Sequence, residues 1–263
     1  MQRVLGVIPA RFASTRFPGK PLASLGDKSM IEQVWLAARR ASRLDRLIIA
    51  TDDRRIADEA ARFGAEIMMT SPDHASGTDR VAEVVRSLDD SLEIVVNVQG
   101  DEPLLTPTSI DRLLEVFDAT SPVPEMATLA EPVTSIDELF DANVVKVVTD
   151  SRGRALYFSR SPIPYYRGSG KRLPTDFRDS LARRDGALAG YRKHQGIYGY
   201  TRRALLSFTR LEPSPLERDE GLEQLRALQA GFTIQVVDSD FRSQPVDTPA
   251  DLERVAKFVT EAN

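Results

Sequence analysis

The sequence contains no cysteine, only two histidines and a single tryptophan. Without cysteine, neither a disulfide nor a cysteine-ligated metal site can form. No apolar run reaches the roughly 18 residues of a membrane-spanning helix, and the N-terminal residues do not resemble a cleavable signal peptide. Basic residues are not in excess, because the net charge is −4, so a broad surface for nucleic acid is not expected. We expect a soluble, cytoplasmic protein that binds neither membrane nor nucleic acid, and any small anion would need a local basic pocket.

The first half of the chain alternates short apolar runs with segments of helical periodicity. The runs are short, rich in β-branched residues and bounded by polar loops, which is typical of buried strands. The predicted strands are residues 4–8, 47–50, 67–69 and 94–98, and the predicted helices are 30–40, 54–63 and 79–88. This alternation predicts an α/β fold with a mostly parallel sheet covered by helices on both faces. Ligands of such sheets bind beyond the carboxyl ends of the strands.

The second half follows the same pattern less regularly. We expect helices over residues 109–117, 216–229 and 249–260, and extended segments over 126–130, 144–148, 155–158, 196–201 and 232–237. Residues 160–192 have no clear period and are interpreted as a long excursion rather than a separate core. The prediction is one domain over 1–263, with 155–200 as the region of subunit contact.

The loop at residues 9–21 is the first candidate site. It carries Arg11, Arg16 and Lys20, follows the first predicted strand, and has no acidic residue. Several cations together with glycine suit phosphate recognition, although a solvated basic loop is the alternative. The Gly-x-x-x-x-Gly-Lys spacing of a Walker loop is absent.

Carboxylates after buried strands are the second signal. Asp101 follows the strand at 94–98, where an unpaired charge is costly but a hard cation can be held, whereas Glu102 could equally begin a turn. Asp247 is a candidate second ligand, but either it or Thr248 could simply cap the helix that begins at Pro249. The pair Asp52 and Asp53 is better explained as the cap and first turn of the helix near Arg54.

Two further loops hold polar residues whose roles the sequence leaves open. At 73–80, Thr78 is expected to cap a helix, and the small residues could lie against a nucleotide base. His74 is expected to be a surface residue. His194 could bind a polyhydroxylated ligand or could equally be a surface histidine.

Taken together, these segments resemble the 3-deoxy-manno-octulosonate (Kdo) cytidylyltransferases. The motifs run in family order over nearly the whole chain: IPARFASTRFPGKPL at 8–22, ATDD at 50–53, DHASGTDR at 73–80, NVQGDEP at 97–103, ALYFSRSPIP at 155–164, HQGIYGY at 194–200, SPLERDEGLEQLRAL at 214–228 and VDTPADLERV at 246–255. The resemblance implies a Rossmann-like nucleotidyltransferase (GT-A-like) sheet with an inserted dimerisation and sugar-binding excursion. It also implies a homodimer.

The activity implied by this resemblance is transfer of CMP from CTP to the anomeric hydroxyl of Kdo, with release of pyrophosphate, for lipopolysaccharide synthesis. The partners are then CTP and Kdo, and the cofactor is Mg²⁺. The residues implied for the nucleotide are Arg11, Lys20, Ser76, Gly77, Arg80 and Gln99. Those implied for the sugar are Arg16, Gln99, His194, Tyr198, Glu223 and Gln224. Asp101 and Asp247 are the implied magnesium ligands, and Arg11, Lys20 and Asp101 the implied catalytic residues.

Two departures from the family pattern keep the acceptor open. Ser243-Gln-Pro245 replaces a glycine-containing turn, and Gln195 stands where an apolar residue is usual. Both are expected on the sugar side, so an 8-amino-Kdo analogue or another acid sugar is an alternative acceptor. A transferase that uses a finished nucleotide-sugar and a non-catalytic nucleotide-binding module are further alternatives.

Overall fold

The computed structural model describes residues 3–14, 16–89, 91–167, 177–182, 186–239 and 241–261. The chain divides into two compact units. Unit 1 comprises residues 1–127, 196–210 and 240–263, and unit 2 comprises 128–195 and 211–239. The predicted excursion at 155–200 therefore falls mostly in unit 2, and a single domain over 1–263 stays a prediction.

Unit 1 is built on a sheet whose central strand is β1. Its elements are β1 (Val4–Ala10), η1 (Lys20–Leu22), β2 (Ser24–Leu25), β3 (Lys28–Ser29), α1 (Met30–Ala38), β4 (Arg46–Thr51), α2 (Arg54–Arg62), β5 (Glu66–Met69), α3 (Gly77–Ser87), β6 (Ile94–Asn97), α4 (Pro107–Ala119), α7 (Arg202–Phe208) and α10 (Pro249–Glu261). Strand β1 is parallel to β4 and β6, and β4 is parallel to β5. Strand β10 (Arg192–Thr201), whose residues 196–201 belong to this unit, runs antiparallel to β6.

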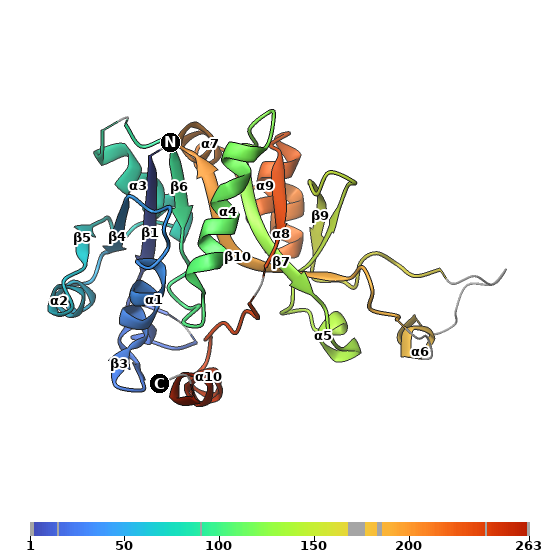
Figure 1. Ribbon diagram of the computed structural model, residues 1–263, viewed down its shortest axis with the longest axis horizontal. Coiled ribbons are helices and arrows are strands. Elements are labelled where there is room, and N and C mark those ends of the chain that lie inside the picture. The colour runs from blue at the N-terminus through green and yellow to red at the C-terminus, as the bar shows by residue number, and fades with distance from the viewer. Residues whose placement is uncertain are drawn as a thin grey trace. The chain divides into compact units, whose positions relative to one another are not determined.

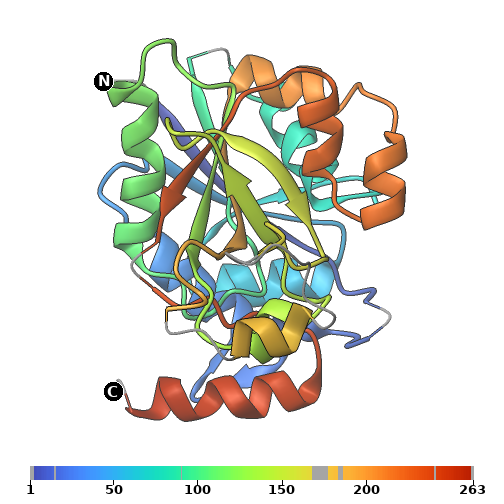
Figure 2. The same ribbon diagram turned by 90° about the vertical axis from the view of Figure 1, so that its right-hand side faces the viewer.

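The composition of β1 explains its central place. Val4, Leu5, Val7 and Ile8 are all buried, so apolar side chains fill both faces, as expected of a parallel strand covered on both sides. In unit 1, α1 and α4 pack together on one face, and α3 and α7 pack together on the other (Figures 1 and 2). The predicted mostly parallel α/β architecture is confirmed.

Unit 2 contains a second set of strands. Its elements are β7 (Met126–Pro132, which begins in unit 1), α5 (Ile136–Phe140), β8 (Lys146–Thr149), β9 (Ala155–Ser159), α6 (Phe177–Ala182), α8 (Pro215–Glu220), α9 (Gln224–Gln229) and β11 (Ile234–Asp238). Strand β7 pairs with β11 and β10, and β8 pairs with β10 and β9. The described part of the excursion shares a hydrophobic cluster with the segment before it. Leu181, Ala187 and Tyr191 are buried against Val133 and Leu139, because apolar residues need no regular period to pack when turns bring them together.

Three predicted boundaries differ from the structure for local physical reasons. The helix expected at 216–229 is two helices, α8 and α9, because the chain takes a left-handed conformation at Gly221 with φ 62°. Helix α3 begins at Gly77 with Ser76 as its cap, two residues before the expected Thr78. Strand β10 begins at Arg192 rather than residue 196, so His194 lies within a strand and not in a loop.

Across the ranges given above, no helix combines the length and apolar character needed to cross a membrane.

Candidate active site

A pocket of about 260 Å³ lies beyond the carboxyl ends of β1 and β6 in unit 1. Three loops and one C-terminal residue supply its walls. The predicted residues that line it are Arg11, Arg16, Lys20, Ser76, Gly77, Arg80, Gln99, Asp101 and Asp247. The structure therefore brings together, from four separate parts of the sequence, all the predicted nucleotide-side and metal-binding residues.

The Lys20 ammonium lies between the two predicted metal-binding carboxylates. Its Nζ is 2.8 Å from Asp101 Oδ2 and 3.4 Å from Asp247 Oδ1, and it also donates to the carbonyl oxygen of Val246 at 2.8 Å. These three contacts match the three donors of an ammonium group. The Asp101 and Asp247 side chains keep 30% and 39% of their surface exposed, so both carboxylates remain open to the pocket.

The two arginines of the basic loop are in different situations. Arg16 Nη1 is 3.0 Å from Asp247 Oδ2, so part of its charge is balanced within the pocket. Arg11 is exposed, and its guanidinium has no ion pair or hydrogen bond with any residue in the described ranges. An unpaired arginine on the pocket wall is a ready donor for phosphate oxygens.

The path of the basic loop depends on Gly19. This residue has φ 73°, and its backbone N–H donates to the carbonyl of Phe12 at 2.9 Å. A Cβ at this position would lie 3.0 Å from the Phe12 ring. Glycine therefore satisfies both the left-handed conformation and the close packing that place Lys20 at the start of η1.

The position of Asp247 is fixed by its neighbours rather than by its own side chain. Val246 is fully buried with Leu25, Met30 and Val255, and its N–H donates to the Asp101 carbonyl at 2.9 Å. The cap of α10 is Thr248, whose hydroxyl accepts from the Asp251 N–H at 3.2 Å. The capping alternative is thereby resolved in favour of Thr248, and the Asp247 carboxylate faces Lys20 and Arg16.

The loop after β6 approaches β1 closely at Gly100. A Cβ there would lie 3.1 Å from the carbonyl oxygen of Pro9, tighter than nearly all real contacts of this kind. The adjacent Glu102 is buried, and its carboxylate accepts a hydrogen bond from the Ser243 hydroxyl. The departure at Ser243–Pro245 thus gives the segment leading to Asp247 a polar contact with the Asp101 loop.

On the opposite wall, Ser76 and Gly77 form the start of α3. The Ser76 hydroxyl accepts from the Asp79 N–H, and the Asp79 carboxylate accepts from the Ser76 N–H, which is a capping box. At Gly77, a Cβ would already touch the Pro9 ring at 3.4 Å. Because Gly77 has no side chain, the backbone at this helix start can approach a ligand closely.

Arg80 is held by residues outside the pocket. Its side chain is 5% exposed, its Nη2 lies 2.9 Å from Asp52 Oδ1, and its Nη1 donates to the Thr70 hydroxyl. Asp53 caps α2 by accepting from the Arg55 N–H, as predicted. Asp52 is therefore no metal ligand but the counter-ion that orients Arg80, a role that no local sequence pattern indicates.

Gln99 and His74 complete the pocket wall. Gln99 Nε2 lies 3.5 Å from Asn97 Oδ1, and the Gln99 side chain packs beside Gly196 of β10. His74 Nε2 contacts the Glu83 carboxylate. Burial opposes ionisation of Glu83, but His74 and the Ser71 N–H outweigh that effect and hold the Glu83 pKa below its usual value. The expected surface histidine thus has an anionic partner at the pocket.

Of the two alternatives left open for His194, its half-buried position disfavours an exposed surface histidine. Its Nε2 is 3.0 Å from the Thr128 hydroxyl, and its ring meets Phe158 edge-on at 5.1 Å between centroids. Some surface remains accessible, yet the surroundings are dense enough that desolvation lowers its pKa to about 3. The imidazole is neutral at physiological pH and can serve as a hydrogen-bonding group but not as a cation.

Gln195 does not share the face of His194. Successive residues of a strand point to opposite faces, and the Gln195 side chain is buried with its Nε2 3.1 Å from Glu131 Oε1. Lys193, two residues away, also contacts Glu131, at 3.3 Å. Gln195 therefore belongs to a buried polar cluster of unit 2, on the face of β10 opposite His194.

The other predicted sugar residues belong to different units of the chain. Tyr198 is buried in unit 1, with its ring centroid 5.9 Å from that of Tyr200. In unit 2, Glu223 immediately precedes α9 and contacts Arg226 at 3.2 Å, and Gln224 is the buried first residue of that helix.

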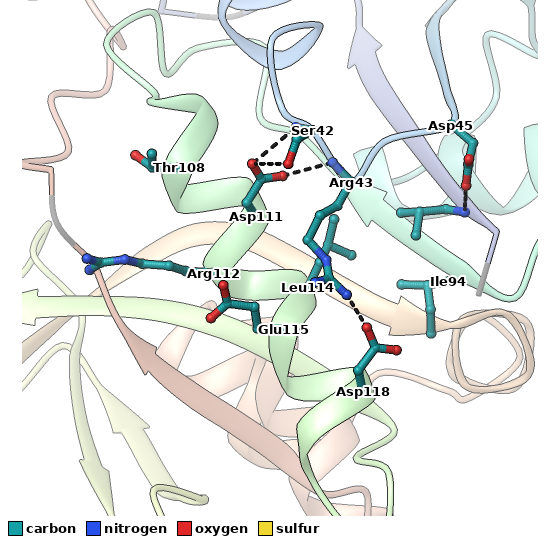
Figure 3. A pocket seen from close by; sticks show the side chains of 11 residues that line it. Ser42, Arg43, Asp45, Ile94, Thr108, Asp111, Arg112, Leu114, Glu115 and Asp118 are labelled. Atoms are coloured by element: carbon teal, nitrogen blue, oxygen red, sulfur yellow. Dashed lines mark hydrogen bonds and ion pairs between the residues drawn. The ribbon is translucent and has the colours of Figure 1, made fainter. Parts of the chain in front are cut away.

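A larger cavity, of about 510 Å³, lies at the other end of the unit 1 strands, beside Val4 and Ile94 (Figure 3). Its carboxylates serve the fold. Asp111 accepts from the Ser42 and Arg43 N–H groups at 3.1 and 3.0 Å, and Asp118 pairs with Arg43. These contacts join α4 to the loop after α1, and we do not assign the cavity a ligand.

Comparison with known proteins identifies the family. The cytidylyltransferase family model matches residues 5–236. A 3-deoxy-manno-octulosonate cytidylyltransferase of Syntrophotalea carbinolica is 50% identical over 96% of each chain, and one of Halorhodospira halophila is 50% identical over 95% of each. This chain belongs to that family.

A solved structure extends the agreement to three dimensions. A CMP:2-keto-3-deoxy-manno-octonic acid synthetase complexed with CTP covers 100% of both chains with a TM-score of 0.87 and 38% identity. A cytidylyltransferase of Leptospira borgpetersenii, 16% identical with a TM-score of 0.62, shares the fold. The family assignment made from the sequence motifs is confirmed.

Proposed function

We propose that this member of the family transfers CMP from CTP to the anomeric hydroxyl of Kdo, forming CMP-Kdo and releasing pyrophosphate. One observation carries the proposal: Arg11, Lys20, Asp101 and Asp247, which come from distant parts of the sequence, line one pocket at the carboxyl ends of parallel strands. The names of the relatives that are about half identical supply the two substrates.

The triphosphate is proposed to bind the wall formed by the basic loop. Arg11 has no ion pair or hydrogen bond among the residues that the structure describes, while Lys20 and Arg16 balance the carboxylates and add positive potential. The backbone at Ser76 and Gly77 lies at the N-terminus of α3, where unsatisfied N–H groups and the helix dipole favour negative charge. Arg80, oriented by Asp52, adds a further cation on this side.

Asp101 and Asp247 would hold magnesium. The donor set fits, because both carboxylates already share one cation, the Lys20 ammonium, and magnesium commonly takes one or two carboxylates together with substrate phosphates. No group of three or more His, Cys, Asp or Glu side chains within the described ranges forms a metal site, so the substrates would complete the coordination. When bound, the ion would neutralise phosphate charge and polarise the α-phosphate.

The reaction is an in-line phosphoryl transfer. The C2 hydroxyl oxygen of Kdo bonds to the α-phosphorus, the bond from that phosphorus to the α–β bridging oxygen breaks, and pyrophosphate leaves with the electron pair. The hydroxyl proton passes to solvent. The residues contribute positioning and electrostatic stabilisation, as in other phosphoryl transfers, and no side chain stands out as a general base.

The acceptor is proposed to meet Arg16, Gln99, His194, Tyr198, Glu223 and Gln224. The structure supports His194 as a neutral hydrogen-bonding group, and the turn of Gln195 to the other face of β10 removes one reason for expecting an altered sugar. The 8-amino analogue is therefore the second choice.

A pyrophosphate-release assay tests the proposal. Release should require CTP, Kdo and Mg²⁺ together, with much lower rates for sialic acid, 8-amino-Kdo and the other nucleoside triphosphates. CTP binding without release under any combination would instead support a non-catalytic module, and a preference for another acid sugar would reassign the acceptor.

A homodimer in the cytoplasm remains part of the proposal. Leu156 and Tyr165, in the segment expected to make the subunit contact, are 61% and 51% exposed, which is high for large apolar side chains. Light scattering of the wild type and of Leu156→Glu tests the contact: the variant should shift toward monomer.

A further inference from the structure

The turn between α8 and α9 carries two of the proposed sugar residues. Helix α8 ends at Glu220, the chain reverses at Gly221 with φ 62°, and α9 begins at Gln224. Glu223, which has a helical conformation, and the buried Gln224 lie directly after this turn at the start of α9, so the conformation of the turn sets where they are placed.

Arg160 closes this turn. It follows β9, and within unit 2 β9 packs against α9 (Figure 1). Its guanidinium donates through Nε to the Glu220 carbonyl at 2.6 Å, through Nη2 to the Gly221 carbonyl at 3.4 Å and through Nη1 to the Ala142 carbonyl at 2.8 Å. One planar group thus satisfies two carbonyls at the end of α8, which a helix leaves without partners.

The Glu220 carboxylate fixes the same contact from the other side. It accepts from the Arg160 N–H at 2.9 Å and from the Ser159 hydroxyl at 2.6 Å. Several hydrogen bonds therefore join the two ends, with every donor from the end of β9 and every acceptor from Glu220 at the end of α8.

Lys146 holds the backbone of Arg160. It is fully buried, and its ammonium donates to the carbonyls of Arg160 at 2.6 Å, of Asp141 at 2.9 Å and of Val144. Desolvation lowers the Lys146 pKa. A buried ammonium used only to bind carbonyls indicates that the geometry of this junction is closely specified.

We propose that Arg160 is a positioning residue for the acceptor sugar: by fixing the turn at Gly221 it orients Glu223 and Gln224 without contacting the substrate. This rests on the proposed function, because it takes Glu223 and Gln224 as sugar contacts. Arg160 itself is not among the residues that line the pocket of unit 1.

The test is a comparison of Michaelis constants. Arg160→Met should raise the KM for Kdo about 10-fold or more and leave the KM for CTP within about 2-fold, because small misplacements of binding groups weaken binding steeply. Arg160→Lys, which retains a donor, should lose less. Arg154→Met is the matched control, since Arg154 forms an exposed ion pair with Asp150 in the same unit and should change neither constant.

A double-mutant cycle separates positioning from a general loss of structure. In a Glu223→Ala/Gln224→Ala background, Arg160→Met should have almost no further effect on the KM for Kdo. An equal rise in both Michaelis constants, or full additivity in the cycle, would overturn the proposal. If Arg160→Met does not fold, Arg160→Lys is carried through the same cycle.

The same data distinguish a wrong sugar assignment for Glu223 and Gln224 from a wrong positioning role for Arg160. If Glu223→Ala and Gln224→Ala leave the KM for Kdo unchanged while Kdo is still consumed, the sugar assignment of these residues is wrong. If they raise it and Arg160→Met does not, only the positioning role is wrong.

Discussion

Unit 1 has arginine and aspartate side chains at both ends of its strands, but the two ends use them differently. In the smaller pocket at the carboxyl ends, Arg11 is unpaired within the described ranges, and the carboxylates of Asp101 and Asp247 share side-chain cations. In the larger cavity at the amino ends, Asp111 accepts from backbone N–H groups (Figure 3). Size therefore does not distinguish the proposed site from the other cavity; the charge that the fold leaves available to a ligand does.

The strongest test of this difference is Asp101→Asn. Removing one charge from the proposed magnesium pair should lower the rate of pyrophosphate release by roughly two to three orders of magnitude, comparable to the loss of one stabilising group in other active sites. The melting temperature should stay close to that of the wild type. Near-normal turnover at limiting magnesium would show that the two ends do not differ in this respect.

Arg11→Met addresses the unpaired cation. Loss of a charge-assisted contact of about 1.5–3 kcal/mol should raise the KM for CTP roughly 10- to 100-fold. Its control is Arg112→Met at the opposite cavity, where no change in the KM for CTP is expected. Equal effects of the two substitutions would contradict the proposed site.

Asp111→Ala tests the cavity at the amino ends of the strands, where a substitution should change stability and not activity. Two backbone N–H groups, those of Ser42 and Arg43, would lose their acceptor, so the free energy of unfolding should fall by about 1–3 kcal/mol. At a temperature where the variant is folded, kcat and both Michaelis constants should be unchanged. Urea unfolding and the pyrophosphate assay on one preparation decide the matter, and a selective change in KM would point to a ligand in the cavity.

The smallest expected effect is the change in the free energy of unfolding that His194 causes as the pH falls. His194 has a folded pKa of about 3 against an ordinary value of 6.5, so below pH 6.5 the unfolded chain binds the proton that the folded chain refuses. This group therefore costs stability as pH falls from 6.5 toward 3, about 2 kcal/mol at pH 5. His194→Asn should lose less stability between pH 7 and pH 5 than the wild type does, which denaturant titrations at both pH values measure; an equal loss in the two proteins would contradict this account of His194.

The sequence predicts the parallel sheet and the pocket because both depend on local signals. Apolar runs such as Val4–Ile8 identify buried strands, and the rule that ligands lie at the carboxyl ends of strands predicts that Lys20 and Asp101 face one site. What local signals do not specify are partners distant in sequence. Nothing near Asp52 indicates that it pairs with Arg80, and nothing near Arg160 indicates that it closes the turn at Gly221.

The errors have the same origin. The strand expected at 196–201 leaves His194 just before it, but pairing with β8 extends β10 back to Arg192 and places His194 within the strand. A helical period continues through 216–229, but one glycine in the left-handed conformation divides it. Asp247 shows the opposite case, since the competing capping role passes to Thr248 and leaves the carboxylate for the pocket.

The alternation of β10 also bears on how such an enzyme can diverge. His194 and Gln195 are adjacent in sequence, yet one lies beside Thr128 and Phe158 and the other beside Glu131. A mutation of Gln195 therefore acts on the buried polar contact with Glu131, whereas a mutation of His194 acts on the face of the strand that holds Thr128 and Phe158. With His194 and Tyr198 as the proposed sugar contacts, a lineage that changes its sugar is expected to change positions 194 and 198, whereas position 195 can change together with its buried partners.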